Sequence, residues 1–472
     1  MLKILQDSRS CQNPFVAKEK HLILRPPPPE KSAPVESPQL SFKRIIEGIR
    51  STFQCFTDIR KESNNFSYSM EDAAISAFSV FFTQSPSFPD YQKRMEQQRG
   101  KSNAQSLFGI HQIPQASQLR RLLDPVSPKE LYPLISSIND ELKNQGLLKN
   151  FININNTCLI PLDGTEFFSS EKISCSCCSS TTLKNGQIRY RHAAVTPMLV
   201  APGQEHVIPL PPEFIHPQDG HEKQDCELAA ATRWLEQQGV HYLSWGVTFL
   251  GDDLYCHQPF CQKVLESGAH FIFVCKPDSH KEAYEWLDDF SRNGTISTVT
   301  RKRWTGKEHL TDTYRFMHHI PLRNSDDALK VNWFELTTTT ESGDIVFRNS
   351  WVTDHAIHER NIEALVLAGR ARWHIENGGN NVLKTKGYHF DHNFGHGDQN
   401  LSNVLATLIL LAYLTHTALD WLDERYHAIR AILPSRRTFF EHMRALIQYI
   451  FFDSWDQLMG FMLDGLNSPD TS

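Results

Sequence analysis

The feature that most constrains the fold is a change in hydrophobic periodicity near Asn156. Beyond this point, short β-type runs alternate with helix-type stretches in the order strand, strand region, helix, strand, helix, strand, helix. Strands separated by helices need crossover connections, which place the helices on the faces of a sheet. The pattern therefore predicts an α/β core, with a mixed sheet flanked by helices.

The individual elements follow from the spacing of apolar residues and from the turn residues between the runs. The expected strands are 157–162, 187–200, 242–250 and 270–275, and the expected helices are 222–238, 259–266 and 280–290. From 295 to 351 the pattern is of the β type throughout. We therefore expect a strand-rich insertion before the chain returns to helix.

The rest of the chain divides around this core. Residues 1–40 are rich in proline, which is typical of a flexible leader. Helical periodicity predicts an N-terminal helical domain, a possible DNA-binding unit, and a helical end to the chain. The expected divisions are 1–40 leader, 41–155 helical domain, 156–294 first part of the core, 295–350 insertion, 351–425 second part of the core and 426–472 C-terminal helices.

Composition narrows the functional classes. The net charge of the 472 residues is -6, so nothing attracts the whole chain to nucleic acid, and a polyanion site would have to be a local basic patch. No apolar segment follows Met1, which indicates a cytoplasmic protein in a reducing compartment. The run Val404–Leu414 is too short to span a bilayer. We expect a core helix there, and no membrane association.

Three acidic residues are candidates for a shared site. Asp163 and Asp252 each come just after an expected strand, at what would be one edge of the sheet, where α/β proteins bind ligands. Glu376 is preceded by Arg372 one turn earlier on the same helix face. The breakers 377–380 follow it, so we expect Glu376 near the end of a helix, facing an adaptable loop. Taken singly, each acid has a structural alternative: a turn residue, a strand-end cap or a surface ion pair.

If the three carboxylates converge, they call for a cation, because like charges at short range disfavour one another's ionisation. Oxygen ligands favour hard divalent ions, which here means Mg²⁺ or Mn²⁺. Such ions activate a water or a 3′-hydroxyl and neutralise charge on a leaving oxygen of a phosphodiester.

Cysteine and histidine patterns indicate further metal candidates. Cys175, Cys178 and His192 form a partial zinc ligand set, with free buried thiols as the alternative. The trio His389, His392 and His396 also has metal-like spacing, but we favour a local structural or phosphate-facing role for it.

A basic run in the expected insertion is a candidate DNA contact. Arg301, Lys302 and Arg303 precede Trp304, and an aromatic ring beside cations suits stacking on an unpaired base. The alternative is a tryptophan packed inside the β module.

Three segments together resemble one protein family. PLDGTEFF, WGVTFLGDDLYCHQPF and GRARWHIENGGNNVLKTKGYHFDHNFGHG are similar to the signature regions of bacterial insertion-sequence transposases of the DDE class, in the subgroup with a Tyr-Arg-Glu-Lys motif. The resemblance extends over about residues 115–422. It implies a ribonuclease H-like core interrupted by a β-rich insertion before the last acid. It also implies that Asp163, Asp252 and Glu376 are the three catalytic, metal-binding acids, in that order.

The resemblance implies DNA contacts as well. Arg372 matches the motif arginine, whereas Gly369 stands where the signature tyrosine belongs and Leu383 where the lysine belongs. Lys384 or Lys386 would replace that lysine by a small shift.

The implied activity is that of a DNA transposase. Such an enzyme binds the terminal inverted repeats of its element, cuts the 3′ strands and joins the ends to target DNA, as a dimer on double-stranded DNA. The alternatives are a stand-alone nuclease on the same core and a catalytically idle, transposase-derived DNA-binding protein.

Overall fold

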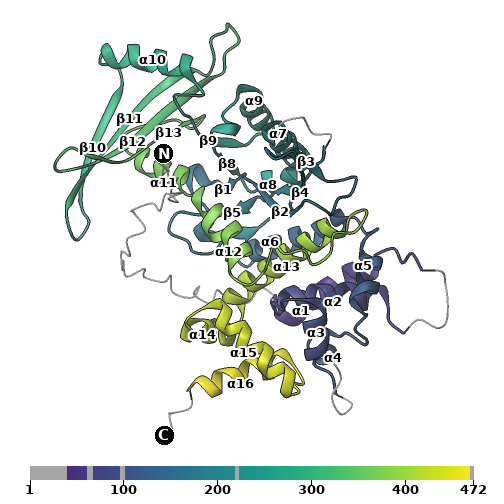
Figure 1. Cartoon of the computed structure of the whole chain (residues 1–472). Coiled ribbons are helices and arrows are strands. Elements are labelled where there is room, and N and C mark those ends of the chain that lie inside the picture. Colours follow the sequence, from purple (N-terminus) through teal and green to yellow (C-terminus); the bar gives the residue numbers. More distant parts are fainter. Residues whose placement is uncertain (1–39, 61–66, 96–100, 218–222, 468–472) are drawn as a thin grey trace, which may run out of the picture. The chain divides into compact units, whose positions relative to one another are not determined.

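The structure is a computed structural model that describes residues 40–60, 67–95, 101–217 and 223–467. Apart from Leu40, the expected leader lies outside these residues. The described residues belong to one compact unit, in which a mixed sheet is flanked by helices (Figure 1). The expected α/β class is therefore confirmed at this level.

The centre of the sheet is a group of three adjacent parallel strands. They are β1 (Cys158–Pro161), β8 (Val247–Gly251) and β9 (His270–Val274), and they pair in this order. All five positions of β8 are buried, as expected for a strand covered on both faces. On its other side, β1 bridges antiparallel to Val200, just after β5 (Met198–Leu199), which pairs with β6 (Ile208–Pro209).

The strand-rich segment continues this sheet. β13 (Ile345–Thr353) pairs antiparallel with β9, and β12 (Lys330–Thr340), β11 (His309–Pro321) and β10 (Ser297–Trp304) follow outward. The result is one seven-stranded sheet, in which β10 is an edge strand with most side chains exposed. The expected boundary at residue 350 thus falls inside β13, since the insertion and the core share this strand.

Helical segments precede β8, connect β8 to β9 and follow β9. The bounds of these elements are α7 (Lys223–Trp234), the π-helical turn η6 (Leu235–Gly239), α8 (Val240–Leu243), η7 (Asp253–Tyr255), α9 (Gln258–Glu266) and α10 (Lys281–Arg292). The strand expected from 242 is wrong at its start. Tyr242 is helical because its ring stacks on that of Trp234, with centroids 6.2 Å apart, and its hydroxyl binds Asn139.

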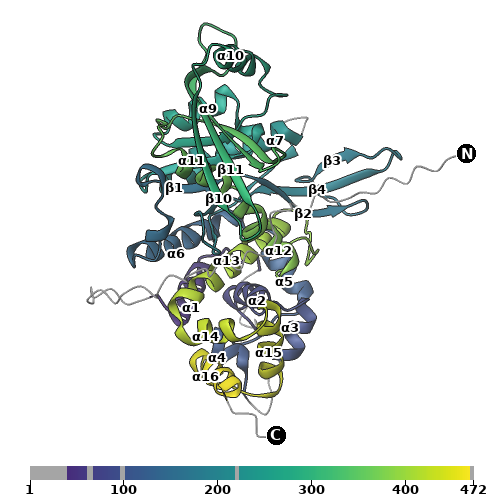
Figure 2. The same ribbon diagram turned by 90° about the vertical axis from the view of Figure 1, so that its left-hand side faces the viewer.

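A second, antiparallel sheet follows β1. β2 (Gly164–Ser170) pairs with β4 (Ile188–Val195), which also pairs with β3 (Ser179–Thr182) and with β7 (Glu213–Phe214). Figure 2 shows β2, β3 and β4 as a long ribbon. We call these strands and their turns the β-ribbon.

Helices from the two ends of the described chain pack together (Figure 2). The N-terminal ones are α1 (Phe42–Gln54), α2 (Met70–Phe82), α3 (Phe88–Met95), α4 (Asn103–Phe108), α5 (Ala116–Leu123), η2 (Pro128–Leu131), α6 (Tyr132–Asn144), η3 (Lys149–Phe151) and η4 (Ile154–Asn156). The C-terminal ones are α14 (Glu424–Ile432), α15 (Arg436–Tyr449) and α16 (Trp455–Asn467). Asn103 of α4 donates to the backbone oxygens of Ile447 and Ile450 at 2.8 and 2.7 Å. Helices α1 to α5 and α14 to α16 therefore form one helical layer, whereas α6 packs on the sheet side, where Asn139 donates to the Pro209 carbonyl of β6 at 3.2 Å.

Helix α13 (Leu401–Leu422) joins this layer to the sheet side, because it contacts both α2 and β6. It is long and apolar enough to cross a membrane by length and composition, but 94% of its most apolar window is buried in the protein. This is the expected core helix.

Candidate active site

Asp163 and Asp252 lie at the same edge of two adjacent parallel strands. Asp163 comes two residues after the end of β1, and Asp252 directly follows β8. The Leu162 N–H donates to the Leu250 carbonyl at 2.8 Å, so the ladder between the two strands runs up to this edge. Their shared position depends only on the parallel pairing of β1 with β8.

Glu376 lies at this edge too. It belongs to a helical segment that follows the strand-rich region in the sequence. α11 (Ile362–Arg370) leads into the π-helical turn η8 (Ile375–Asn380) and then α12 (Asn381–Thr385). The Arg372 Nη1 lies 2.9 Å from the Glu376 Oε1. Asn380 donates from Nδ2 to the Asp163 Oδ2 at 3.3 Å and accepts from the Thr196 hydroxyl at 3.1 Å. This segment therefore touches the first acid directly.

The expected adaptable loop after Glu376 is wrong, because residues 377–380 continue the helix as a π-helical turn. The two glycines allow this turn to pack closely. A Cβ on Gly379 would lie 2.4 Å from the Met198 sulfur, and a Cβ on Gly378 would lie 3.0 Å from the Val207 side chain. Here glycine serves close packing rather than chain flexibility. Such π-helical turns are often found at functional sites.

Asp163 experiences the charges of the other acids. Burial, followed by the charge of Glu227, raises the pKa of Asp163 to about 7, while Arg372 opposes the shift and Glu376 and Asp252 add to it. Three carboxylates from separate parts of the chain thus act on one half-buried aspartate. Like charges at short range raise a carboxyl pKa in this way.

Glu227 of α7 is the acid that sequence reasoning missed. Its Oε1 accepts from the Gly164 N–H at 3.1 Å and from the Tyr255 hydroxyl at 2.9 Å, and its side chain is buried. A Cβ on Gly164 would lie 2.3 Å from the Glu227 carboxylate, so only glycine admits this approach. Spacing along the chain gives no signal for Glu227, since the contact joins separate elements.

Asp253, the neighbour of Asp252, points elsewhere. Its Oδ1 accepts from the Lys276 N–H at 2.7 Å and lies 3.5 Å from the His280 Nε2. Burial opposes the shift, but the contacts with His280, Ser279 and the Lys276 N–H lower the pKa of Asp253. Asp252 instead caps η7, accepting from the Leu254 N–H at 2.9 Å.

The donor set at this edge fits a hard divalent cation, because it consists of carboxylate oxygens around a carboxyl group with a raised pKa. In the described residues, the carboxylate oxygens of this set do not form a group in which all ligand atoms lie within 4.8 Å of one another. The set consists of Asp163, Asp252, Glu376 and Glu227. A cation bound here would therefore draw these side chains together.

The two signature positions that depart from the transposase motif have packing explanations. A Cβ on Gly369 would lie 2.9 Å from the indole nitrogen of buried Trp351, so a tyrosine has no room there. Leu383 is fully buried in the core. Lys384 is half-buried and Lys386 is exposed at the end of α12, so both lysines reach the surface.

The basic run of the strand-rich region lies on edge strand β10. Trp304 is 58% exposed, so the alternative that it packs inside the β module is wrong. Arg301 pairs with Glu363 of α11 at 2.8 Å, and Arg303 pairs with Asp312 of β11 at 2.7 Å. Arg301, Arg303 and Trp304 are distant in sequence from the three acids. Their contact with DNA stays a prediction.

The expected zinc residues do come together, and one more joins them. Cys175, Cys178 and His192 of the β-ribbon form a compact group with His396, which lies in the loop before α13. His389 and His392, which share the spaced trio with His396, are not part of this group.

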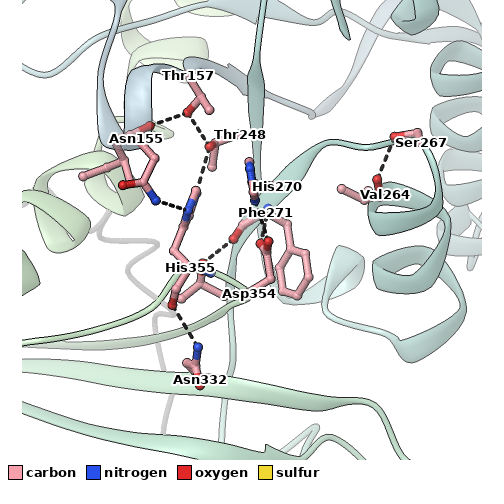
Figure 3. A network of polar contacts seen from close by, with 12 residues as sticks. Asn155, Thr157, Thr248, Val264, Ser267, His270, Phe271, Asn332, Asp354 and His355 are labelled. Atoms are coloured by element: carbon pink, nitrogen blue, oxygen red, sulfur yellow. Dashed lines mark hydrogen bonds and ion pairs between the residues drawn. The ribbon is translucent and has the colours of Figure 1, made fainter.

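At the opposite edge of the parallel strands, a polar network joins the strands (Figure 3). The His355 Nε2 lies 2.9 Å from the Thr248 hydroxyl, which lies 2.6 Å from that of Thr157. The His270 Nδ1 lies 2.6 Å from the Asp354 Oδ2. Burial lowers the pKa of His355 to about 4, so the ring is neutral at pH 7. Because both His355 nitrogens have partners, we assign this network to strand alignment rather than to chemistry.

The chain matches no protein-family model and no curated protein sequence.

Proposed function

We propose that this protein is a DNA transposase that cuts and joins phosphodiester bonds with a divalent metal. The observation that carries the proposal is the group of carboxylates at the carboxyl edge of β1 and β8, where Asp252, Glu376 and Glu227 all raise the pKa of half-buried Asp163. The resemblance of the signature segments places three of these acids at the catalytic positions of the DDE class.

A ribonuclease H-like core is part of this proposal. The support is a mixed sheet in which parallel β1, β8 and β9 have antiparallel neighbours on both sides. The strand-rich segment also lies between the second acid and the glutamate, as in the subgroup that the chain resembles.

In this proposal Asp163, Asp252 and Glu376 hold Mg²⁺ or Mn²⁺, which when bound supplies Lewis-acid activation of a water or a 3′-hydroxyl. The other residues position these acids. Asn380 orients the Asp163 carboxylate by donating to it, and Arg372 holds Glu376 through their ion pair. Glu227 keeps the Asp163 carboxyl in a strongly negative surrounding, which increases its affinity for a cation.

The DNA contacts of this proposal are Arg372, Lys384 and Lys386 near the acids and Arg301, Arg303 and Trp304 on β10. Because the net charge is -6, these local cations must provide the attraction to the DNA backbone. Exposed Trp304 suits stacking on a base that has left the duplex. Since two element ends must be brought together, we expect a dimer on DNA, acting in the bacterial cytoplasm.

The experiment uses the full-length protein, Mg²⁺ and a DNA that carries the two sequences flanking its reading frame. We expect nicking at the inverted repeats followed by joining to a target plasmid. Asp163→Asn, Asp252→Asn and Glu376→Gln should each abolish both steps but retain DNA binding, because they remove metal ligands and leave the basic surface intact.

Asp253→Asn is the matched control, since the amide keeps an acceptor for the Lys276 N–H. This variant should remain active. Cleavage without joining or without preference for the flanking repeats would instead indicate a stand-alone nuclease. Binding to the repeats with no cleavage would indicate an idle DNA-binding protein. A wild-type protein that neither binds nor cuts the flanking DNA contradicts the proposal.

A further inference from the structure

Four thiol and imidazole side chains meet where the β-ribbon contacts the loop before α13. The Cys175 and Cys178 sulfurs are 3.8 Å apart, and the His192 Nε2 lies 3.5 Å from the first and 3.4 Å from the second. The His396 Nε2 lies 3.3 Å from the Cys178 sulfur and 3.1 Å from the His192 Nε2. All four ligand atoms lie within 4.8 Å of one another.

These spacings are those of a tetrahedral zinc site. With Zn–S near ~2.3 Å and Zn–N near ~2.0 Å, tetrahedral angles place two sulfurs roughly 3.8 Å apart, a sulfur and a nitrogen roughly 3.5 Å apart, and two nitrogens roughly 3.3 Å apart. The distances between the sulfurs and nitrogens in the structure follow this pattern closely. Hydrogen bonding among thiols and imidazoles would not require all four atoms to surround one point.

The orientation of His396 is also that of a ligand. Its Nδ1 lies 2.8 Å from the Gly397 carbonyl, so Nδ1 carries the proton and Nε2 keeps its lone pair directed at the cysteines. Metal-binding histidines commonly fix their tautomer through such a bond. The ring of Phe168 lies against that of His396, with centroids 4.5 Å apart, and helps exclude water.

The loop that bears His396 is held in place independently of the cluster. Arg120 of α5 donates to the Phe394 carbonyl at 2.8 Å, and the Asp124 carboxylate accepts from the N–H groups of Asp398 and Gln399 at 3.0 Å each. The β-ribbon presents the other three side chains. The site is therefore assembled from two separately supported segments.

We propose that Cys175, Cys178, His192 and His396 bind one structural zinc ion. Two thiols and two imidazoles form a closed tetrahedral set with no open position, which is the mark of a structural site. The two thiols bind as thiolates, so binding releases two protons to solvent.

The metal would connect distant parts of the chain. His192 and His396 are 204 residues apart, one in the ribbon that follows Asp163 and the other in the loop that follows the Glu376 segment. A zinc ion here would fix the β-ribbon to the segment of the third acid. The proposal depends on this geometry alone and stands whether or not the protein is a transposase.

The first test is the metal content of full-length protein made under reducing conditions. We expect about one zinc per chain in the wild type and in Cys177→Ser, because Cys177 lies in the same turn but outside the group. Cys178→Ser should lose most of the zinc and unfold at a lower temperature. A wild type without zinc, or equal zinc loss in Cys177→Ser and Cys178→Ser, overturns the proposal.

The second test identifies the ligands even if Cys178→Ser folds poorly. X-ray absorption of the wild type should show two sulfur and two nitrogen ligands, at ~2.3 and ~2.0 Å. His396→Cys should retain the metal with three sulfur ligands, whereas His396→Ala should bind it more weakly. A wild-type spectrum without sulfur, or a His396→Cys spectrum that still shows two, excludes this ligand set.

Discussion

At the scale of single residues, the ionised carboxylate of Asp163 lowers the free energy of unfolding at neutral pH. Its pKa is raised from 3.8 to about 7, so the folded state binds a proton that the unfolded state has already lost. Between these two values the free energy of unfolding therefore falls as the pH rises, and the loss is complete above pH 7. A cation that neutralised this carboxylate would restore the lost stability.

Asp163→Asn should therefore stabilise the magnesium-free protein at pH 8, by about 2–4 kcal/mol, and have little effect near pH 4. Denaturant unfolding of both proteins at the two pH values measures this difference. Added Mg²⁺ should raise the stability of the wild type only. Asp253→Asn should behave oppositely, since the pKa of Asp253 is lowered and its ionised form stabilises the fold. An Asp163→Asn variant that is less stable at pH 8 would contradict the electrostatic argument.

Glu227 gives a second prediction at the residue scale, because among the charged groups it has the largest effect on the pKa of Asp163. Glu227→Gln keeps an acceptor for the Gly164 N–H and the Tyr255 hydroxyl but removes the charge. The pH midpoint of Mn²⁺ binding, followed by paramagnetic resonance, should move down by about half a unit or more. A purely structural role would leave the midpoint unchanged. A shift upward would contradict the electrostatic argument.

At the scale of elements, local periodicity was sufficient where one environment extends along a whole segment. The expected strand-rich stretch 295–351 corresponds to β10 to β13, and the core helix expected over 404–414 lies within α13. Local periodicity failed where a tertiary contact determines the secondary structure. Tyr242 is one case, because its ring packs on Trp234. The glycines of η8 are another, because they fit against Met198 and Val207.

The candidate sites show the same limit. The edge shared by Asp163 and Asp252 could be predicted because strand ends are visible in the sequence. Glu227 and the meeting of His396 with the cysteine group could not, since each contact spans a separation that only folding closes, 63 residues from Glu227 to Gly164 and 204 from His396 to His192. Spacing motifs find ligands on one element and miss those supplied by another.

The departure at Gly369 yields an element-scale prediction. Gly369→Tyr, which would restore the signature residue, should destabilise the protein by about 1–3 kcal/mol or more, because the new Cβ meets Trp351, which stacks on Phe334 and cannot withdraw. Gly465→Ala in α16 is the matched control. A Cβ there meets nothing, so this change should be neutral or slightly stabilising. Equal melting temperatures for wild type and Gly369→Tyr would show that Trp351 gives way.

At the scale of the whole molecule, α13 makes the helical layer and the sheet side depend on one another. It is buried along nearly its full length and contacts α2 and α14 on one side and β6 and α12 on the other. Neither side can lose its structure without exposing one face of this apolar helix. We therefore expect the described region to unfold in a single cooperative transition, although sequence patterns divide it into several domains.

Two tryptophans on opposite sides test this expectation. Trp455 of α16 stacks on Phe42 with centroids 4.3 Å apart and donates to the Asp423 carboxylate at 2.7 Å, and Trp351 of β13 stacks on Phe334 at 5.3 Å. Each change to alanine should cost about 3–5 kcal/mol through the cavity it leaves. In scanning calorimetry both variants should lower the midpoint of the same transition. Two transitions, one moved by Trp455→Ala and the other by Trp351→Ala, would show that α13 does not couple the two sides.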